Sequence, residues 1–229
     1  MISLVDFSTV EALSGSDTLS FLLIRHGESV SSTKQIVGGH LGCSGLTPLG
    51  RAQAVSLSVA LEVLVGGIGE RPIHCSNIER SIETAEIATS RSRQGFIQSC
   101  GVCETHPGSL DGLYWSDLDH GDASLGLGAP IGPGAESQFE MAERVDQYLG
   151  SLAMARETVS QSPTALIFTH AGVIRACYSI AGAYPLAAAF RLPVDLCSVH
   201  LLQARLPTST SSNQVRSFSE LEARIWRVL

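Results

Sequence analysis

Short runs of apolar residues alternate along the chain with longer segments of helical periodicity. Apolar runs bounded by polar or turn-forming residues are typical of strands buried within a sheet. The runs that fit this pattern best are 19–24 (LSFLLI), 72–76 (PIHCS) and 165–169 (ALIFT); a weaker candidate lies at 97–103, and 199–204 and 223–228 are candidates for closing strands.

Helix signals lie between these runs. Thr47 and Pro48 provide an N-cap followed by proline at the first helical position, and the Gly66-Gly67 pair ends the apolar periodicity that follows. Further helices are expected at about 78–90, 136–160 and 172–181. Strands that alternate with helices of this length predict an α/β fold, with a mostly parallel central sheet and helices on both faces.

The pattern predicts one domain with an insertion. Residues 1–19 are polar and irregular, so we interpret them as an N-terminal arm that precedes a domain over 20–229. Residues 121–134 are rich in glycine and proline and lack periodicity, which favours a lid, and the lid insertion is expected over about 113–135. With 229 residues, of which 44% are hydrophobic, the chain is able to bury one sizeable core.

The charge balance limits the expected partners. Fifteen Lys and Arg residues against 22 Asp and Glu residues give a formal net charge of -7. Because nucleic acids and anionic membranes are bound through excess positive charge, neither is an expected partner. The apolar stretch 173–190 is interrupted by Arg175 and Pro185, so no membrane span is expected. The N-terminus lacks the basic start of a secretory signal, and we expect a cytoplasmic protein.

Residues with useful chemistry follow the predicted strands at the points where each strand ends. Arg25 and His26 follow the first strand, and Arg80 lies on the helix after the second. Glu104 follows the weak third strand, and His170 follows the last of the three clear runs. Because sheets of this kind bind ligands at the carboxyl ends of their strands, these side chains are expected to share one site.

This set of side chains suits phosphoryl transfer. Guanidinium groups hold phosphoryl oxygens in fork geometry, and one histidine is able to attack phosphorus while a second, in its cationic form, stabilises the transferring charge. A carboxylate protonates the leaving oxygen and then activates water, and backbone amides at Gly27 and Ala171 add donors. Each residue taken alone is more often structural; their occurrence together at successive strand ends favours a site.

Several segments resemble the motifs of one known family. Arg25-His26-Gly27-Glu28 resembles the signature of the histidine phosphatase superfamily, also known as the phosphoglycerate mutase-like family. The other segments that resemble its motifs follow in the family's order: 46–54, 75–85 (with Ser76, Arg80 and Thr84), 133–137 and 169–175. The resemblance extends from about residue 20 to the end of the chain.

The resemblance implies roles for particular residues. It makes His26 the phosphohistidine nucleophile and assigns Arg25, Arg80 and His170 to the phosphate pocket. It implies a metal-independent reaction that needs no cofactor. Two alternative alignments of residues 104–112 with family segments both select Glu104 as the general acid/base, and Asp111 is the competing candidate.

Further substrate contacts are expected around this centre. The candidates are Gly27, Ser32, Thr47 and Ala171. Ser32 stands where the family commonly has asparagine, and its hydroxyl is still able to donate one hydrogen bond. His40 and Ser44 lie in the same loop as Ser32 and are additional candidates.

The departures from the family's mutases favour hydrolysis. Thr105 and Pro107 stand where the mutases carry an arginine and a tyrosine that hold the substrate. We therefore expect a phosphomonoester hydrolase; phosphoglycerate mutase activity and an inactive relative that binds phosphorylated ligands are the alternatives. The motifs look most like the α-ribazole phosphatase and broad-specificity phosphatase branch, which implies α-ribazole phosphate or a sugar phosphate as a small-molecule phosphate ester.

The lid and the C-terminus bear on specificity and assembly. Acidic residues of the lid, Asp117, Asp119 and Asp122, are expected to repel a second phosphate and so to favour a monophosphate. The apolar C-terminal segment with Trp226 is expected to close the sheet. Either a monomer or a homodimer fits the sequence.

Two cysteines have a spacing that metal and redox sites share. Cys100 and Cys103 are separated by two residues, with His106 close behind, which would give a Cys-Cys-His set. No second Cys or His pair stands at zinc-site spacing. We interpret the two cysteines as thiols on adjacent turns at a strand edge, with no metal expected.

Overall fold

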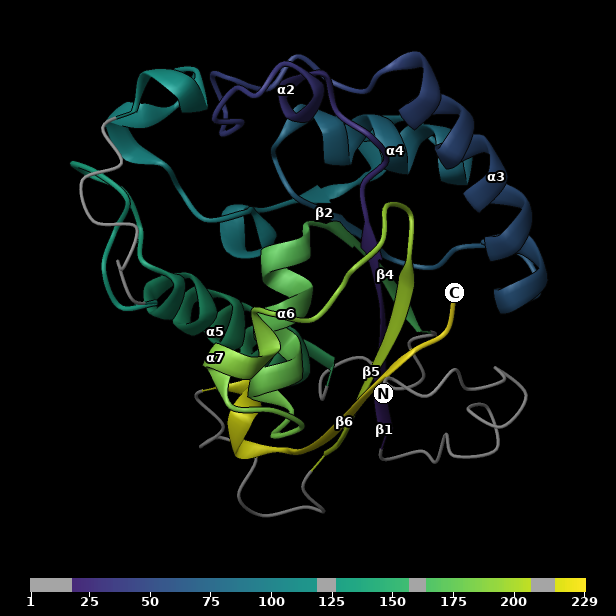
Figure 1. Ribbon diagram of the computed structural model, residues 1–229. Helices are drawn as coiled ribbons and strands as arrows, with labels where there is room; N and C mark the ends of the chain where they lie inside the picture. The colour runs from purple at the N-terminus through teal and green to yellow at the C-terminus, as the bar shows by residue number, and fades with distance from the viewer. Residues whose placement is uncertain (1–17, 119–126, 157–163, 207–216) are drawn as a thin grey trace.

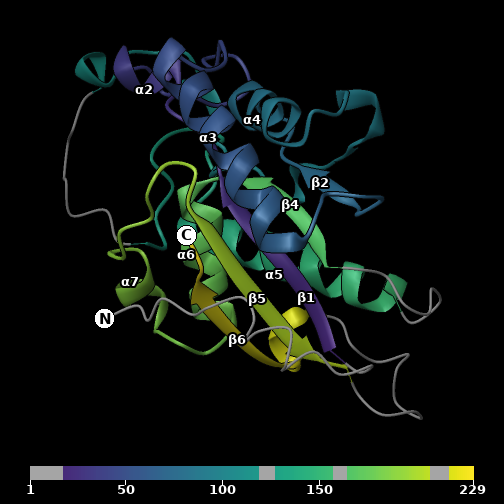
Figure 2. The ribbon, with the colours of Figure 1, turned by 90° about the vertical axis from the view of Figure 1, so that its right-hand side faces the viewer.

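A six-stranded mixed sheet lies at the centre of the computed structural model, which describes residues 18–118, 127–156, 164–206 and 217–229 (Figure 1). The strands are β1 (Thr18–Arg25), β2 (Ile73–Cys75), β3 (Ile97–Gln98), β4 (Ala165–Thr169), β5 (Val199–Arg205) and β6 (Glu222–Arg227). Their order in the sheet is β3-β2-β4-β1-β5-β6. Strands β3, β2, β4 and β1 pair in parallel, whereas β5 is antiparallel to both of its neighbours, β1 and β6. Figure 2 shows β1, β5 and β6 side by side.

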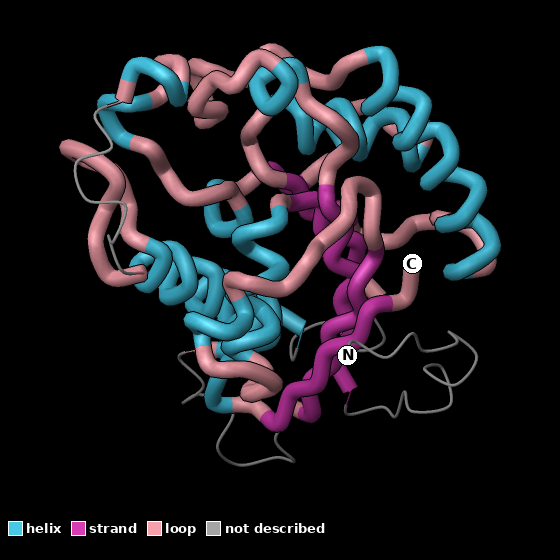
Figure 3. The backbone as a smooth tube through the Cα atoms, viewed as in Figure 1, coloured by secondary structure: helices cyan, strands magenta, loops and turns pink. Residues whose placement is uncertain are grey.

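Helices cover both faces of this sheet, as the alternation of strands and helices predicts. The helices are α2 (Val30–Thr33), α3 (Pro48–Val65), α4 (Glu79–Thr89), α5 (Gln138–Arg156), α6 (Ala171–Ile180) and α7 (Leu186–Ala189), with short 3-10 turns at η1 (Arg93–Gly95), η2 (Cys100–Val102), η3 (Gly108–Leu110), η4 (Trp115–Asp117) and η6 (Phe218–Glu220). Helices α3 and α4 pack on one face, and α5 and α6 pack on the other. Figure 3 shows the strands between these two groups of helices.

The side chains of β1 divide the core into two layers. Leu22 and Ile24 join the cluster that contains α3 and α4, whereas Phe21 and Leu23 join the cluster that contains α5 and α6. Successive side chains of a strand point to opposite faces, so an unbroken apolar run is what a strand buried on both faces requires. This burial explains why the run at 19–24 has no polar alternation.

Helix α3 begins and ends where the sequence predicts. The Thr47 hydroxyl accepts a hydrogen bond from the backbone N–H of Gly50, and Gly66 ends the helix in the left-handed conformation at φ 63°. By length and composition α3 is apolar enough to cross a membrane. In this fold it packs Leu57 and Leu61 into the core instead.

The predicted third strand is largely wrong. Only Ile97 and Gln98 pair with β2, and residues 100–102 form the 3-10 turn η2. The Ser99 hydroxyl accepts the backbone N–H of Gly101 and so caps this turn. A side chain that caps a turn competes with strand pairing, which ends β3 early.

Other expectations fall partly outside the described residues. The N-terminal arm lies there except for its last residues, because β1 already begins at Thr18. The lid segment 119–126 and the end of the predicted helix after residue 156 also lie there. The short helices α2 and α7 were not expected from the sequence.

His200 supplies a test of the buried core. It is buried on β5, with Nδ1 3.0 Å from the Tyr178 hydroxyl and Nε2 3.1 Å from Ser198 Oγ. Burial, with a contribution from Arg227, lowers the pKa of His200 to about 4. The unfolded chain, with an ordinary histidine pKa near 6.5, therefore binds a proton that the folded chain does not, so this contribution to stability is complete above about pH 6.5 and decreases as the pH falls towards 4.

We expect wild type to lose about 2 kcal/mol more unfolding free energy than His200→Gln between pH 7 and pH 5. Urea unfolding of both proteins at each pH measures the difference. Both are compared again between pH 7 and pH 8, where the two pH dependences are expected to be the same. Parallel curves over the acidic range would show that His200 does not titrate as described.

Candidate active site

The parallel pairing of β1 with β4 sets the position of the site. Arg25 lies opposite Thr169 in the register, so the residues that follow them, His26 and His170, leave the same edge of the sheet. The backbone N–H of His26 donates to the carbonyl of Thr169 at 3.1 Å, which extends the pairing by one residue. Ser76, after β2, is tied to β4 in the same way through the carbonyl of Phe168 at 3.0 Å.

His26 is buried with one ring nitrogen free of a proton. The Nε–H of Arg80 donates to His26 Nε2 at 3.0 Å, and His26 Nδ1 lies 2.6 Å from the carbonyl oxygen of Gly27. A guanidinium group is only a donor, so Nε2 carries the lone pair and Nδ1 carries the proton. Burial lowers the pKa of His26 well below its usual range, and the charges of Arg80 and Arg25 lower it further.

Arg80 is held in place from a third segment. It is the second residue of α4, and its Nη1 donates to the carbonyl oxygen of Gly38 at 2.7 Å. The side chain is buried. A guanidinium group fixed at both ends presents its remaining N–H groups in one orientation, which is what recognition of an anion requires.

His170 lies beside His26, with ring centroids 5.1 Å apart. Its Nε2 is 2.7 Å from Ser76 Oγ, whereas its Nδ1 is buried without a hydrogen-bond partner. The hydroxyl of Ser76 donates to Cys103 Sγ and has one proton only, so His170 Nε2 is the donor towards Ser76. Burial is the main cause that lowers the pKa of His170 well below its usual range. The charge of Arg80 and the neighbouring His26 lower this pKa further.

Arg25 has the second unpartnered atom. One of its terminal nitrogens donates to the carbonyl of Val194, and its Nε has no partner. Within the described residues, Arg25 Nε and His170 Nδ1 are the buried side-chain nitrogen or oxygen atoms that make no hydrogen bond. Buried polar atoms are nearly always paired, so these two are the polar atoms here that a ligand would pair.

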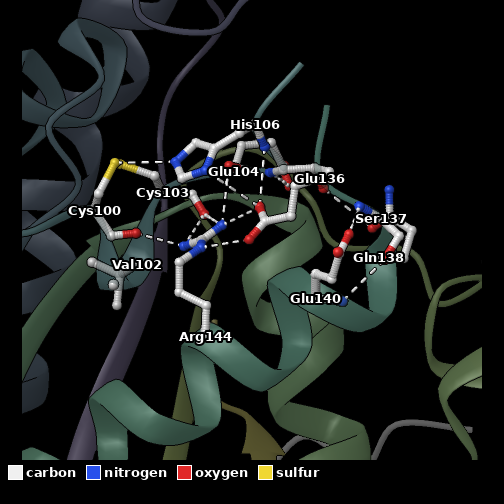
Figure 4. A network of polar contacts seen from close by, with 12 residues as sticks. Cys100, Val102, Cys103, Glu104, His106, Glu136, Ser137, Gln138, Glu140 and Arg144 are labelled. Carbon is white, nitrogen blue, oxygen red and sulfur yellow. Dashed lines mark hydrogen bonds and ion pairs between the residues drawn. The ribbon is translucent and has the colours of Figure 1, made fainter. Parts of the chain in front are cut away.

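Glu104 borders the same centre. Its Oε2 accepts the backbone N–H of Gly172, at the start of α6, at 3.1 Å, and its Oε1 accepts that of Thr105 at 3.1 Å. A Cβ atom at Gly172 would lie 2.0 Å from Glu104 Oε1, so only glycine allows the carboxylate this position. The carbonyl of Glu104 is bound by Arg144 of α5 at 3.4 Å, as Figure 4 shows.

Arg25, His26, Arg80 and Glu104 open into a cavity of about 390 Å³, whereas His170 is fully buried behind them and is not among the residues that line it. The residues that line it include the predicted site residues Arg25, His26, Ser32, Arg80 and Glu104, the lid residues Trp115 and Ile131, and residues not predicted: Ser29, Ser31, Gln138, Arg175 and Phe190. Arg175 lies on α6 five residues after His170, and its Nε donates to the carbonyl of Leu192 at 2.9 Å. Its position in the segment 169–175, which resembles a family motif, is the sequence signal from which it could have been identified.

Three predicted substrate contacts, Gly27, Thr47 and Ala171, are not among the residues that line the cavity. The N–H of Gly27 donates to Thr84 Oγ1 at 3.1 Å, and a Cβ atom there would lie 2.6 Å from the carbonyl oxygen of Gly50. Thr47 caps α3 and donates to Glu28 Oε1 at 2.7 Å. These contacts give Gly27 and Thr47 a role in holding α3 against the site.

Asp111, the competing acid/base candidate, lies outside the cavity. Its carboxylate accepts backbone N–H groups from Gly39, Leu41 and Gly42 at 2.8–2.9 Å. It therefore organises the loop after α2. His40, in that loop, has its Nε2 3.2 Å from Cys100 Sγ and lines no part of the cavity, and neither does Ser44.

Comparisons with known proteins point to one family. The sequence profile of the histidine phosphatase superfamily (branch 1) matches residues 21–223. A metal-independent phosphoserine phosphatase of Arabidopsis thaliana is 29% identical over 173 residues, which are 71% of this chain and 68% of that protein.

Solved structures share the fold. The native mycobacterial glucosyl-3-phosphoglycerate phosphatase superposes with a TM-score of 0.70 at 21% identity, covering 93% of this chain and 100% of that one. A putative alpha-ribazole-5'-P phosphatase from Escherichia coli gives a TM-score of 0.63 at 23% identity, covering 81% and 90% of the two chains. Because the family profile extends over nearly the whole described domain, the chain belongs to the histidine phosphatase superfamily.

Proposed function

We propose that the protein hydrolyses small phosphate monoesters in two steps, through a phosphoryl group carried on His26 Nε2. The observation that carries this proposal is the environment of that nitrogen. It is unprotonated, held by Arg80, and near two buried nitrogens without partners: Arg25 Nε, which is a donor, and His170 Nδ1, which becomes a donor when the ring takes up a proton. A nucleophile next to unsatisfied donors is the arrangement that an incoming phosphoryl group completes.

The unpartnered donors suit the phosphoryl oxygens. Arg25 Nε and the remaining N–H groups of Arg80 donate without any change of charge. His170 Nδ1 donates only when the ring takes up a proton, since its Nε2 already donates to Ser76. A bound dianion raises the pKa of a neighbouring histidine, so His170 takes up its proton together with the substrate.

Each step balances with Glu104 as the proton carrier. In the first step the N–P bond forms, the bond from phosphorus to the leaving oxygen breaks, and the Glu104 proton goes to that oxygen. In the second step water attacks phosphorus, its proton goes to Glu104, and the electron pair of the N–P bond returns to Nε2. No metal ion takes part in either step. Glu104 lines the cavity, whereas Asp111 lies outside it and accepts three backbone N–H groups of the loop after α2, which supports Glu104 over Asp111.

Two observations support hydrolysis over mutase activity. Thr105 and Pro107 line the cavity where the family's mutases carry substrate-holding side chains. The Thr105 hydroxyl donates to Gln138 Oε1 at 3.2 Å instead of pointing a charge at the ligand. Mutase activity and phospholigand binding without turnover are the alternatives that the experiment below separates.

The outer cavity indicates a leaving group with both apolar and anionic parts. Trp115, Ile131 and Phe190 supply apolar surface, and Arg175 supplies a cation. The similar proteins are named for phosphoserine, glucosyl-3-phosphoglycerate and α-ribazole phosphate, and the last of these is a substrate that the motifs favour. Of the acidic lid residues, Asp117 is exposed and lines no part of the cavity, and Asp119 and Asp122 lie outside the described residues.

The protonation of His170 predicts how anion binding depends on pH. Sulfate is the probe because its own charge does not change between pH 6.5 and pH 8. Uptake of one proton by His170 makes the sulfate affinity fall about tenfold for each pH unit of increase. Calorimetric titration of wild type is expected to show this slope. His170→Asn is expected to bind sulfate more weakly, and its affinity is expected to lack the tenfold change per pH unit that His170 causes.

A matched control for sulfate binding is Arg224→Ala, because Arg224 is exposed on β6 away from the cavity. It is expected to keep the wild-type affinity and slope, whereas Arg25→Ala is expected to lose most of the affinity. An unchanged slope in His170→Asn would contradict the proposed proton uptake.

Phosphate release tests the proposed reaction. The panel consists of p-nitrophenyl phosphate, phosphoserine, α-ribazole phosphate, glucosyl-3-phosphoglycerate and 3-phosphoglycerate, with no divalent cation added. His26→Ala is expected to lose on the order of 10³-fold or more of the activity, and Glu104→Gln about 10²- to 10⁴-fold, because each loses a reacting group.

Asp111→Asn is the control for Glu104→Gln, and it is expected to retain far more activity. Isomerised phosphoglycerate without net phosphate release would identify a mutase. Binding of the esters without any turnover would identify an inactive relative. An active His26→Ala enzyme would refute the proposed nucleophile.

A further inference from the structure

Two cysteines and two histidines converge beside the active site without lining its cavity. They are His40, Cys100, Cys103 and His106, and their candidate ligand atoms all lie within 4.8 Å of one another. We propose that this cluster is a closed zinc site that fixes the segment carrying Glu104.

The distances fit one ion. Cys100 Sγ lies 2.7 Å from Cys103 Sγ, 3.2 Å from His40 Nε2 and 3.2 Å from His106 Nε2. In a tetrahedral zinc site with ordinary Zn–S and Zn–N bonds, the ligand atoms lie about 3.3 to 3.8 Å apart. The two sulfur atoms lie closer together than this range and other pairs lie up to 4.8 Å apart, so shifts of about 1 Å, outward for the first and inward for the second, convert the cluster into that geometry.

The ligand types select zinc. Two thiolates and two imidazoles form a Cys₂His₂ set, and tetrahedral sets of this kind favour zinc over harder cations. The thiolates cancel the charge of the ion, so the bound site adds no net charge to a half-buried position. With four protein ligands no position is left for substrate, which makes the site structural.

The sequence interpretation missed the fourth ligand. Cys100, Cys103 and His106 are each separated by two residues, but His40 lies 60 residues before Cys100. The three carboxylate contacts of Asp111 fold the loop after α2 so that His40 reaches the cluster. Spacing along the chain does not reveal a ligand that tertiary contacts supply.

Outer contacts hold the ligands as established metal sites require. Arg144 of α5 donates to the carbonyl oxygens of Cys100 and Cys103, and it forms an ion pair with Glu136 at 2.7 Å (Figure 4). Glu136 Oε2 accepts the backbone N–H of His106 at 3.1 Å and lies 3.6 Å from His106 Nδ1. A carboxylate behind a histidine whose other nitrogen faces the metal is a common arrangement at zinc sites.

The cluster is open to solvent on one side and connected to the active site on the other. His40 is exposed and Cys100 is half-buried, so an ion is able to enter, whereas Cys103 is buried. The Ser76 hydroxyl lies 3.3 Å from Cys103 Sγ and 2.7 Å from His170 Nε2. Cys103 also directly precedes Glu104.

These connections define what the ion would do. Anchoring Cys103 fixes the start of the Glu104 side chain, and anchoring His40 fixes the loop whose Gly38 carbonyl binds Arg80. A misplacement of about 1 Å in such a group costs on the order of 10²-fold in rate. The zinc ligands are therefore positioning residues and take no part in the bond-making steps.

Metal content is the primary test. The chain is produced with zinc, dialysed under reducing conditions and analysed by plasma mass spectrometry, and about one zinc per chain is expected, as one four-ligand site holds one ion. Cys103→Ser and His40→Asn are expected to lose the zinc. Cys43→Ser is the matched control, a half-buried cysteine outside the cluster, and is expected to retain it.

A spectroscopic test guards against variants that fail to fold. Cobalt added to the zinc-free wild-type chain is expected to give the thiolate charge-transfer absorption and the intense visible bands of a tetrahedral Cys₂His₂ site. His40→Asn changes an exposed residue, so it is expected to remain folded and to show a weakened or altered spectrum.

A final experiment tests the positioning role. It rests on the proposed hydrolase activity, whereas the measurement of metal content is independent of that activity. Removal of zinc is expected to lower kcat about 10- to 100-fold with little change in KM, and added zinc is expected to restore wild type but not His40→Asn.

A reduced wild-type chain that holds neither zinc nor cobalt would overturn the site. A zinc-free Cys100–Cys103 disulfide would overturn it in favour of a redox pair. One bound zinc with kcat unaffected by its removal would overturn the positioning role. A total lack of phosphate release with one zinc bound would count against the proposed function and leave the metal site in place.

Discussion

The parallel pairing of β1 with β4 is the constraint on which the candidate site depends. Five consecutive residue pairs, ending at Arg25 and Thr169, fix the two strands in register. Because the register leaves no freedom at the strand ends, His26 and His170 emerge side by side from segments far apart in sequence. A slip of one residue would turn Leu22 and Ile24 out of their core layer, so the packing of both layers protects the geometry of the site.

Burial of these groups gives the site its reactivity at a cost to stability. Burial and the nearby arginines lower the pKa values of His26 and His170, which leaves Nε2 of His26 unprotonated, as the proposed nucleophile must be. In the part of the chain that the structure describes, two buried nitrogen atoms remain without hydrogen-bond partners. Unpaired buried polar atoms cost about 1 to 3 kcal/mol each, and an anion that pairs with them recovers this energy on binding.

The proposed zinc site would also hold a residue of the candidate site in place, by metal coordination instead of strand pairing. The acid/base candidate Glu104 follows β3, which pairs with β2 over two residues only. The sheet therefore constrains Glu104 far less than it constrains His26. Arg144 binds the carbonyls of this segment, and a zinc ion on Cys100, Cys103 and His106 would supply the rigidity that strand pairing does not.

The sequence predicted those parts of the structure that follow from local pattern. Buried strands and the start of α3 could be recognised because apolar runs and the Thr47-Pro48 cap act within a few residues. The segment 97–103 was misjudged because the Ser99 side chain turns the backbone into η2. Arg175 and Phe190 could not be assigned to the cavity, and His40 could not be assigned to the cysteines, because tertiary contacts alone bring them there.

The central claim is that His26 Nε2 receives the phosphoryl group, and the most direct measurement is the identity of the phosphorylated atom. Glu104→Gln enzyme is mixed with a good phosphate ester, quenched in base within the first turnover, digested and analysed by mass spectrometry and phosphorus NMR. The account predicts phosphohistidine at His26 with phosphorus bound to Nε2, because Nδ1 is held by the Gly27 carbonyl. Phosphorus on Nδ1, on His170 or on another residue would contradict it.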